Sequence, residues 1–500
     1  MTEDPVSCVL AAWRREPISS AVEQVLRDAD CRAWLVGGAV RDALLGRPVR
    51  DWDLLCDNPT ALAAELAGRT GSRLVPLYET PVTYRLVLVP GTGAARYLDL
   101  VAFRAATVER DLAERDFTIN AMAVGLPDGP WLDPAGGLAD LRSRVLRAVT
   151  PVSLPADPVR CLRTYRFHSE LGFTIAGETR RQLRKLAGRL QEAAGERIGQ
   201  ELLKLLRPPR VSETLRLMEE DGALWAILPE MAATRGVLQG GYHHLDVWGH
   251  TLEVVGQMER LLTTGSRALH RSAEAVAHYL SVTERWPMLL LAALLHDVSK
   301  PGCRLVDAEG HVRFLGHETE GSRVALGICR RLALGSELGE TLGRLIRLHL
   351  RPLLLANTAL PAGQRLAENI SMAALRRLFR HAGRDAVGLV LLAIADAHGC
   401  RGPAVRPGYQ EAITAVLDDM LARYLAWEAE SSAEPLLRGA DLIAAGYQPS
   451  PAFGRALRAV EEARVEGWVS TRAEALELAR RYLQHGGGAT RLSESSAQPE

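Results

Sequence analysis

The sequence predicts an α+β protein in which a small mixed sheet is followed by a long and mostly helical remainder. Two observations predict the sheet. Residues 31–56 contain two short apolar runs that flank a glycine pair and a helix-like segment, and residues 84–89 and 96–101 are runs typical of strands. Beyond residue 141 the chain is rich in leucine and helical in pattern, which predicts an all-helical neck, body and tail.

The elements around the sheet can be assigned in chain order. Residues 1–30 read as one helix that leads into the first strand. After the second strand, residues 60–68 have the pattern of a capped helix with Thr60 as its N-cap. The two later strands have the spacing of a hairpin, with a turn at residues 91–93.

Composition bounds the class of protein. A chain of 500 residues with 47% hydrophobic content is too long for one core and predicts three or four domains. The formal net charge is zero, so any RNA-binding surface has to be a local patch. Seven cysteines without a C-x-x-C pair argue against a zinc ribbon or a disulfide framework. Because neither a signal core nor a membrane-spanning run is evident, we expect a cytoplasmic protein that has no membrane partner.

The segment around the first two strands carries the strongest chemical signal. Asp51 and Asp53 are one residue apart on a predicted strand, so their side chains point to the same face and could hold Mg²⁺. Gly37 and Gly38 lack side chains, so backbone N–H groups there could approach a phosphate. Each pattern alone is common on solvated strand ends and in turns, but together they suggest phosphoryl or nucleotidyl transfer.

With Arg41-Asp42 between them, these patterns resemble the class II nucleotidyltransferases, which include bacterial CCA-adding tRNA nucleotidyltransferases and poly(A) polymerases. The family motif is a GG-x-VRD-x-LLG stretch followed by D-x-D, and residues 37–46, Asp51 and Asp53 fit it. The resemblance implies a polymerase β-like head in which Asp51 and Asp53 are catalytic Mg²⁺ ligands. It also implies that Gly37, Gly38 and Arg41 bind the nucleotide.

Two further segments extend the predicted head site. Asp99, on the strand at 96–101, could complete a three-carboxylate metal site, or it could be a charge at a strand edge. Residues 114–123 resemble the family's R-R-D-F-T-I-N-A block, which contacts the sugar and triphosphate of the incoming nucleotide. Arg115, Asp116 and Asn120 match this block, whereas Glu114 replaces its first arginine.

Residues 141–210 hold fifteen Lys and Arg against six Asp and Glu, which predicts either an RNA backbone-binding face or a solvated helical face. Within this segment, Arg160 and Arg163 are three residues apart on one helix face. The helix resembles the E-D-x-x-R template of CCA-adding enzymes, whose side chains pair with the edge of CTP or ATP. Asp157 and Arg160 match the template and Arg163 matches a further nucleotide-contacting arginine, but Ala156 replaces the glutamate.

Histidines concentrate in the second half, where eleven of the thirteen lie between His243 and His398. Isolated buried histidines are more often hydrogen-bonded core residues. Here, however, the order H…HD…D in Leu-rich helical sequence resembles the HD phosphohydrolase domain, although Ser299 replaces a common glycine. The resemblance implies a divalent metal (Mn, Ni, Fe or Mg). Its ligands would be His250, His296, Asp297 and Asp396, with His317 and His349 as additional ligands of a two-metal site.

These observations predict five regions: a nucleotidyltransferase head (20–148), a neck that binds the base and RNA (149–235), an HD domain (240–402), a helical RNA-binding tail (403–485) and a disordered C-terminus (486–500). We expect an enzyme that adds C and/or A to the 3′ end of tRNA or another RNA from CTP and ATP. Its HD domain would hydrolyse phosphates at RNA ends. Two alternatives stay open: a poly(A) polymerase, and an HD phosphohydrolase whose head only binds nucleotide. The sequence does not indicate an oligomeric state.

Overall fold

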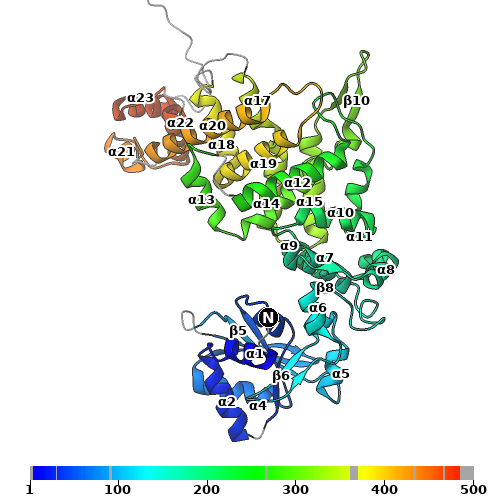
Figure 1. Cartoon of the computed structure of the whole chain (residues 1–500). Helices are drawn as coiled ribbons and strands as arrows, with labels where there is room; N and C mark the ends of the chain where they lie inside the picture. Colours follow the sequence, from blue (N-terminus) through cyan, green and yellow to red (C-terminus); the bar gives the residue numbers. More distant parts are fainter. Residues whose placement is uncertain are drawn as a thin grey trace, which may run out of the picture. The chain divides into compact units, whose positions relative to one another are not determined.

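The computed structural model describes residues 4–29, 31–88, 93–264, 269–360, 370–431, 435–465 and 468–484. The turn expected at residues 91–93, except Gly93, and the C-terminus expected to be disordered lie outside these residues. The chain divides into two compact units, which are residues 1–232 with 328–334, and residues 233–327 with 335–500. Figure 1 shows the sheet in the N-terminal part of the first unit and helices throughout the second.

A seven-stranded mixed sheet forms the centre of the head, with strand order β3-β4-β5-β2-β1-β6-β7. Strand β2 pairs in parallel with β5 and antiparallel with β1, so β2 lies in the interior of the sheet. In this register Asp53 is opposite Asp99. The strands are β1 (Ala33–Val36), β2 (Asp51–Cys56), β3 (Arg73–Glu79), β4 (Val82–Val87), β5 (Tyr97–Ala102), β6 (Ala123–Gly125) and β7 (Trp131–Leu132).

The helices of the head are α1 (Pro5–Trp13), α2 (Ile18–Ala29), α3 (Gly38–Leu44), α4 (Pro59–Thr70), α5 (Val108–Ala113) and α6 (Gly137–Ser143). Two expectations for this region are wrong. The single helix expected over residues 1–30 is two helices, because Pro17 cannot donate a helical hydrogen bond and the chain turns there. The N-cap of α4 is Asn58 rather than Thr60, since the Asn58 side chain accepts from the N–H of Ala61 at 3.1 Å and Pro59 fits the first turn.

The neck follows the sheet within the same unit and is helical except for one short strand pair. Its helices are α7 (Val159–Leu171), α8 (Gly177–Leu186), α9 (Gly195–Leu205), α10 (Val211–Glu220) and α11 (Ala223–Ile227). The strand pair joins β8 (Val145–Leu146) to β9 (Thr174–Ile175), a detail that the all-helical prediction missed because two-residue strands leave no periodic signal. Buried Asp221, which directly follows α10, accepts hydrogen bonds from Tyr165 of α7 and from Arg180 and Arg184 of α8. These bonds link the three helices.

The second unit is a helical body with one small hairpin. Helix α19 forms its centre, because every residue of α19 except His398 is buried, and it packs against α12 and α20. The hairpin pairs β10 (Arg304–Val306) with β11 (Val312–Phe314). The helices are α12 (Val247–Thr264), α13 (Ala273–Ser281), α14 (Arg285–Leu295), α15 (His317–Arg331), α16 (Ser336–Leu348), α17 (Leu350–Asn357), α18 (Met372–Ala382), α19 (Ala386–Gly399), α20 (Tyr409–Ser431), α21 (Gly439–Ala444), α22 (Pro451–Val465) and α23 (Arg472–Gln484). The last residues of α15, 328–331, belong to the first unit.

The last three helices have a small core of their own. Leu442, Val460 and Val469 are buried there together with Ala475 and Ala479. Among the described residues, no helix combines the length and the apolar character that a bilayer crossing requires.

Candidate functional site

A cleft of about 960 Å³ lies within the first unit and is lined by both the sheet and the neck helices. Every residue predicted for the head and neck site lines it: Gly37, Gly38, Arg41, Asp51, Asp53, Asp99, Arg115, Asp116, Asn120, Asp157, Arg160 and Arg163. These positions span more than a hundred residues of sequence, and the fold brings them to one cavity.

Three carboxylates on adjacent strands line one wall of the cleft. Asp51 and Asp53 alternate with buried Trp52 on β2, and Asp99 is opposite Asp53 on β5. Burial raises the pKa of Asp53 to about 6, and the charges of Asp99 and Asp51 add to this rise. Burial also raises the pKa of Asp51. A divalent cation would relieve this mutual repulsion, so the donor set fits Mg²⁺, which prefers carboxylate oxygens.

Asp99 differs from the other two carboxylates because it already has a cationic partner. Arg85 on β4 donates to both of its oxygens, at 2.8 and 2.7 Å. Such a bidentate pair holds the carboxylate in a fixed orientation. Asp99 is therefore better placed to orient the site than to be the main cation ligand. The sequence does not single out Arg85, because a strand arginine carries no signal of its own.

Gly37 permits a close approach between β1 and the guanidinium of Arg115. Its φ is +75°, a conformation that favours glycine, and a Cβ there would lie 2.7 Å from Nη1 of Arg115 and 3.3 Å from Oδ2 of Asp53. The N–H of Gly37 donates to the carbonyl of Met122 at 3.4 Å. The Nε of Arg115 is buried and has no hydrogen-bond partner among the described residues, so this side chain can accept a further anionic partner.

A continuous polar network joins the head to the neck across the cleft. Buried Arg41 donates to both oxygens of Asp42 at 2.9 Å and to the amide oxygen of Asn120 at 2.8 Å. Asn120 donates to Asp116 at 3.1 Å, and Asp116 accepts from Arg163 on α7 at 2.8 Å. Although burial alone would raise the pKa of Asp116, Arg163 and Asn120 hold it below its ordinary value.

The neck supplies more arginines to the cleft than its template motif contains. Arg160 donates to the carbonyl of Ser153 at 2.9 Å, and burial lowers its pKa. Asp157 pairs with Arg197 of α9 at 2.6 Å. Arg197 and Arg166 line the same cleft; both belong to the basic segment that the sequence singled out, but only the fold shows where they point.

A second cluster lies in the second unit around the buried carboxylate of Asp297. Its Oδ2 is 3.1 Å from Nε2 of His296 and 3.8 Å from Nε2 of His250, while its Oδ1 is 3.3 Å from Nε2 of His317 and 3.8 Å from Nε2 of His349. Asp297 thus lies between two pairs of imidazoles, each able to hold a metal ion together with one of its oxygens. The fourth predicted ligand, Asp396, lies with the first pair, where its Oδ1 is 3.0 Å from Nε2 of His250.

The hydrogen bonds of the imidazoles indicate that this cluster suits metal ions. His296, His317 and His349 each place Nδ1 against a backbone carbonyl, at 2.9, 2.6 and 2.6 Å. Their Nε2 atoms are buried, have no hydrogen-bond partner among the described residues and converge on Asp297. Nδ1–H donation of this kind leaves a lone pair on Nε2, as metal ligation requires.

Lys300 adds a positive charge to the HD cluster, although the order of the metal-ligand motif gives no signal for it. Its Nζ is 2.6 Å from Oδ2 of Asp297 and donates to Gln239 at 2.7 Å. Burial alone would raise the pKa of Asp297, but His296 and Lys300 hold it well below its ordinary value.

The fold and these two clusters define a nucleotidyl-transferring enzyme with a fused HD domain. Three family models match the chain: "Poly A polymerase head domain" over residues 33–147, "Probable RNA and SrmB- binding site of polymerase A" over residues 172–234, and "HD domain" over residues 247–397.

The chain belongs to the family of tRNA nucleotidyltransferases. It is 35% identical over 465 residues to an A-adding tRNA nucleotidyltransferase of Deinococcus radiodurans, covering 91% of this chain and 96% of the relative. It is 36% identical over 481 residues to a CC-adding tRNA nucleotidyltransferase of Thermus thermophilus, covering 94% of this chain and 96% of the relative. In fold it is similar to the Thermotoga maritima CCA-adding enzyme complexed with tRNA, with a TM-score of 0.59, 20% identity, and coverage of 96% of this chain and 98% of that one.

Proposed function

We propose that this enzyme adds cytidine and/or adenosine nucleotides to the 3′ end of tRNA from CTP and ATP, releasing pyrophosphate. The observation that carries the proposal is the cleft itself, where the carboxylates of β2 and β5 face the arginines of α7. A triphosphate is an anion and needs two kinds of partner. One is a cation that carboxylates hold, and the other is a set of guanidinium groups that donate to the phosphate oxygens.

In the proposed mechanism, Asp51 and Asp53 hold Mg²⁺, with Asp99 orienting the site. Mg²⁺ bound there supplies Lewis-acid stabilisation of the charge that develops on the α-phosphate and pyrophosphate. Arg115, whose Nε lacks a hydrogen-bond partner among the described residues, donates to the phosphates or sugar of the nucleotide. The oxygen of the RNA 3′-hydroxyl bonds to the α-phosphorus and loses its proton to solvent, while the bond from this phosphorus to the pyrophosphate oxygen breaks.

The neck selects the base in this proposal. Arg160 and Asp157 present a donor fork and a carboxylate, which are complementary to the edges of cytosine and adenine. Arg163 is held by Asp116, so it acts from a fixed position. Arg41 and Asn120 link Asp116 to the head and keep the two walls of the cleft in register.

The decisive experiment is incorporation of labelled CTP and ATP, separately and together, with Mg²⁺. The acceptors are tRNA transcripts that end at the discriminator base, at C and at CC. Ordered addition of CCA identifies a full CCA-adding enzyme in which Ala156 is tolerated. Addition of CC alone or A alone identifies a partial activity, like those in the names of the two relatives. Long A tails from ATP identify a poly(A) polymerase, and no incorporation on any acceptor contradicts the proposal.

We also propose a phosphohydrolase activity for the HD domain, on phosphates at RNA 3′ ends. The imidazole nitrogens that converge on Asp297 support it, because they would hold two divalent ions with Asp297 between them. Release of phosphate from a 2′- or 3′-phosphorylated RNA end in Mn²⁺, Ni²⁺ or Mg²⁺ is the assay. The alternative that the head only binds nucleotide is disfavoured by three carboxylates in one cleft, which a pure binding module does not need.

A further inference from the structure

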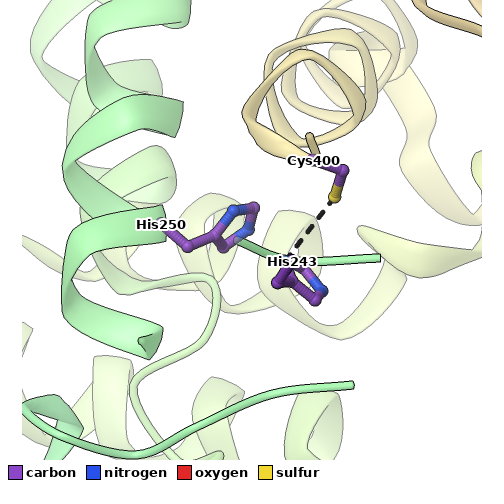
Figure 2. A group of neighbouring side chains, drawn as sticks. All are labelled: His243, His250 and Cys400. Atoms are coloured by element: carbon purple, nitrogen blue, oxygen red, sulfur yellow. Dashed lines mark hydrogen bonds between the residues drawn. The ribbon is translucent and has the colours of Figure 1, made fainter. Parts of the chain in front are cut away.

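A third group of metal-binding side chains lies beside the HD cluster and includes two residues, His243 and Cys400, that the proposed function does not use. Figure 2 shows His243, His250 and Cys400 together. His243 precedes α12, His250 lies in the first turn of α12, and Cys400 directly follows α19. Each offers one ligand atom, and these atoms all lie within 4.8 Å of one another.

The spacing of the His243 and Cys400 donors matches that of a tetrahedral zinc site. Nδ1 of His243 is 3.7 Å from Sγ of Cys400. In a tetrahedral site with ordinary Zn–S and Zn–N bond lengths, these two donors are about 3.6 Å apart. The ring of His243 also meets the ring of His250 edge to face, with centroids 4.5 Å apart.

The two ring nitrogens of His250 have different surroundings. Nε2 lies 3.0 Å from Asp396 and belongs to the HD cluster. Nδ1 is buried and has no hydrogen-bond partner among the described residues, although a buried polar atom of this kind ordinarily has one. A Cβ built on Gly399, the residue before Cys400, would lie 3.1 Å from this Nδ1 and 3.0 Å from Cε1 of the same ring.

The backbone around Cys400 holds His243 and Cys400 near each other. The N–H groups of Gly402 and Ala404 donate to the carbonyls of Tyr242 and Gly241, at 2.8 and 3.0 Å, and so attach the loop before His243 to the chain after Cys400. A Cβ on Gly402 would lie 2.2 Å from the Gly241 carbonyl oxygen, so only glycine allows this approach. The arrangement is a built scaffold rather than a chance meeting of surface side chains.

We propose that His243, His250 and Cys400 form a site for a soft divalent cation, specifically Zn²⁺, with the fourth position left for water or an added ligand. A thiolate and two imidazoles suit Zn²⁺ better than Mg²⁺ or Mn²⁺. On binding, the proton of the Cys400 thiol passes to solvent, and His250 offers the lone pair of Nδ1 while its Nε2–H donates to Asp396. Since His243 and Cys400 are only partly buried, an ion can reach this site from solvent. The shared imidazole couples it to the HD cluster.

Cobalt(II) gives a direct test on the full-length protein, because thiolate ligation produces a charge-transfer band in the near ultraviolet that nitrogen and oxygen ligands do not. The protein is stripped with a chelator and titrated with Co²⁺. We expect the band in the wild type, its loss in Cys400→Ser, and its bleaching when Zn²⁺ displaces Co²⁺. His243→Ala should weaken Co²⁺ binding at least roughly tenfold, since even changes around a metal's ligands cost that much.

Two controls separate this site from its neighbours. Cys303→Ser removes another partly exposed free thiol and should leave the band unchanged. His349→Ala removes a ligand from the far side of the HD cluster and should also leave it. A wild type without the band, or a band that persists in Cys400→Ser, overturns the proposal. His243→Ala gives an independent reading, because His243 lies in a loop outside the helices.

Discussion

The cleft of the first unit and the buried cluster of the second both contain carboxylates, but the pKa values of these carboxylates are shifted in opposite directions. In the cleft, burial raises the pKa values of Asp51 and Asp53; the charge of Asp99 adds to this rise, and Arg85 and Arg115 reduce it. In the HD cluster, imidazoles and Lys300 surround Asp297 and lower its pKa.

This difference indicates which cation the side chains of the cleft and those of the HD cluster each suit. The cleft offers carboxylate oxygens to a cation, and more Arg and Lys than Asp and Glu side chains line it, as a hard cation carried with a triphosphate requires. The HD cluster is buried, rich in nitrogen donors and largely neutralised from within. The HD cluster therefore suits a tightly held metal ion that binds nitrogen donors more strongly than Mg²⁺ does. Four predictions test this contrast, from the largest expected effect to the smallest.

Asp51→Asn or Asp53→Asn should lower nucleotide incorporation roughly a thousandfold, because loss of a Mg²⁺ ligand removes several kcal/mol of transition-state stabilisation. Steady-state incorporation onto tRNA measures this effect. Phosphate release by the HD domain should not change in either variant. Asp57→Asn is the matched control, since Asp57 is exposed just after the same strand. Wild-type incorporation in both site variants would falsify the assignment.

His296→Ala should abolish phosphate release from phosphorylated RNA ends while leaving incorporation within about twofold of wild type, since the two clusters lie in separate units. Parallel assays of both activities on one preparation give the comparison. His311→Ala, an exposed histidine on the hairpin turn, should affect neither activity. A parallel loss of both activities would show that the two units are not independent.

Arg163→Ala should lower kcat/KM for incorporation and destabilise the first unit by about 2 kcal/mol, because it leaves buried Asp116 without its ion-pair partner. Denaturant unfolding and nucleotide kinetics measure the two effects. Arg181→Ala removes an arginine from an exposed pair with Glu178 and should cost less than about 1 kcal/mol. Equal losses in the two variants would contradict the role of the network.

The smallest effect concerns metal-free stability, where the two clusters should respond with opposite signs. The pKa of Asp53 is about 6 in the fold, above its ordinary value, so its ionisation opposes folding as pH rises from about 4 to 6. Asp53→Asn should therefore raise the Tm of the first unit by about 2–4 °C at pH 7 in chelator, and not at pH 4.

The pKa of Asp297 is lowered, so its ionised form favours folding above its ordinary pKa, and this contribution is lost as pH falls. Asp297→Asn should thus lower the Tm of the second unit at pH 7. Calorimetry at both pH values separates the two cases. A fall in Tm for Asp53→Asn at pH 7 would show that the ionised Asp53 carboxylate does not destabilise the metal-free fold.

The sequence by itself determined which residues carry chemistry wherever the signal is local. A strand alternates its side chains, so the D-x-D spacing already predicts that Asp51 and Asp53 share a face. The order of the H…HD…D motif likewise predicts His296 and Asp297 as metal ligands. The strand and helix patterns also predicted the α+β architecture, with errors where Pro17 breaks a helix and where β8 and β9 are too short to show periodicity.

Only the tertiary structure decided how these residues are partnered. The pairing of Asp99 with Arg85, the network from Arg41 to Arg163 and the meeting of His243 with Cys400 join residues on separate elements. His243 and Cys400 are 157 positions apart. Periodicity reports which face a side chain occupies on its own helix or strand, but not which element packs against that face. Those contacts arise from the packing of the whole unit, in which glycines such as Gly37 and Gly402 admit the approach that brings the side chains together.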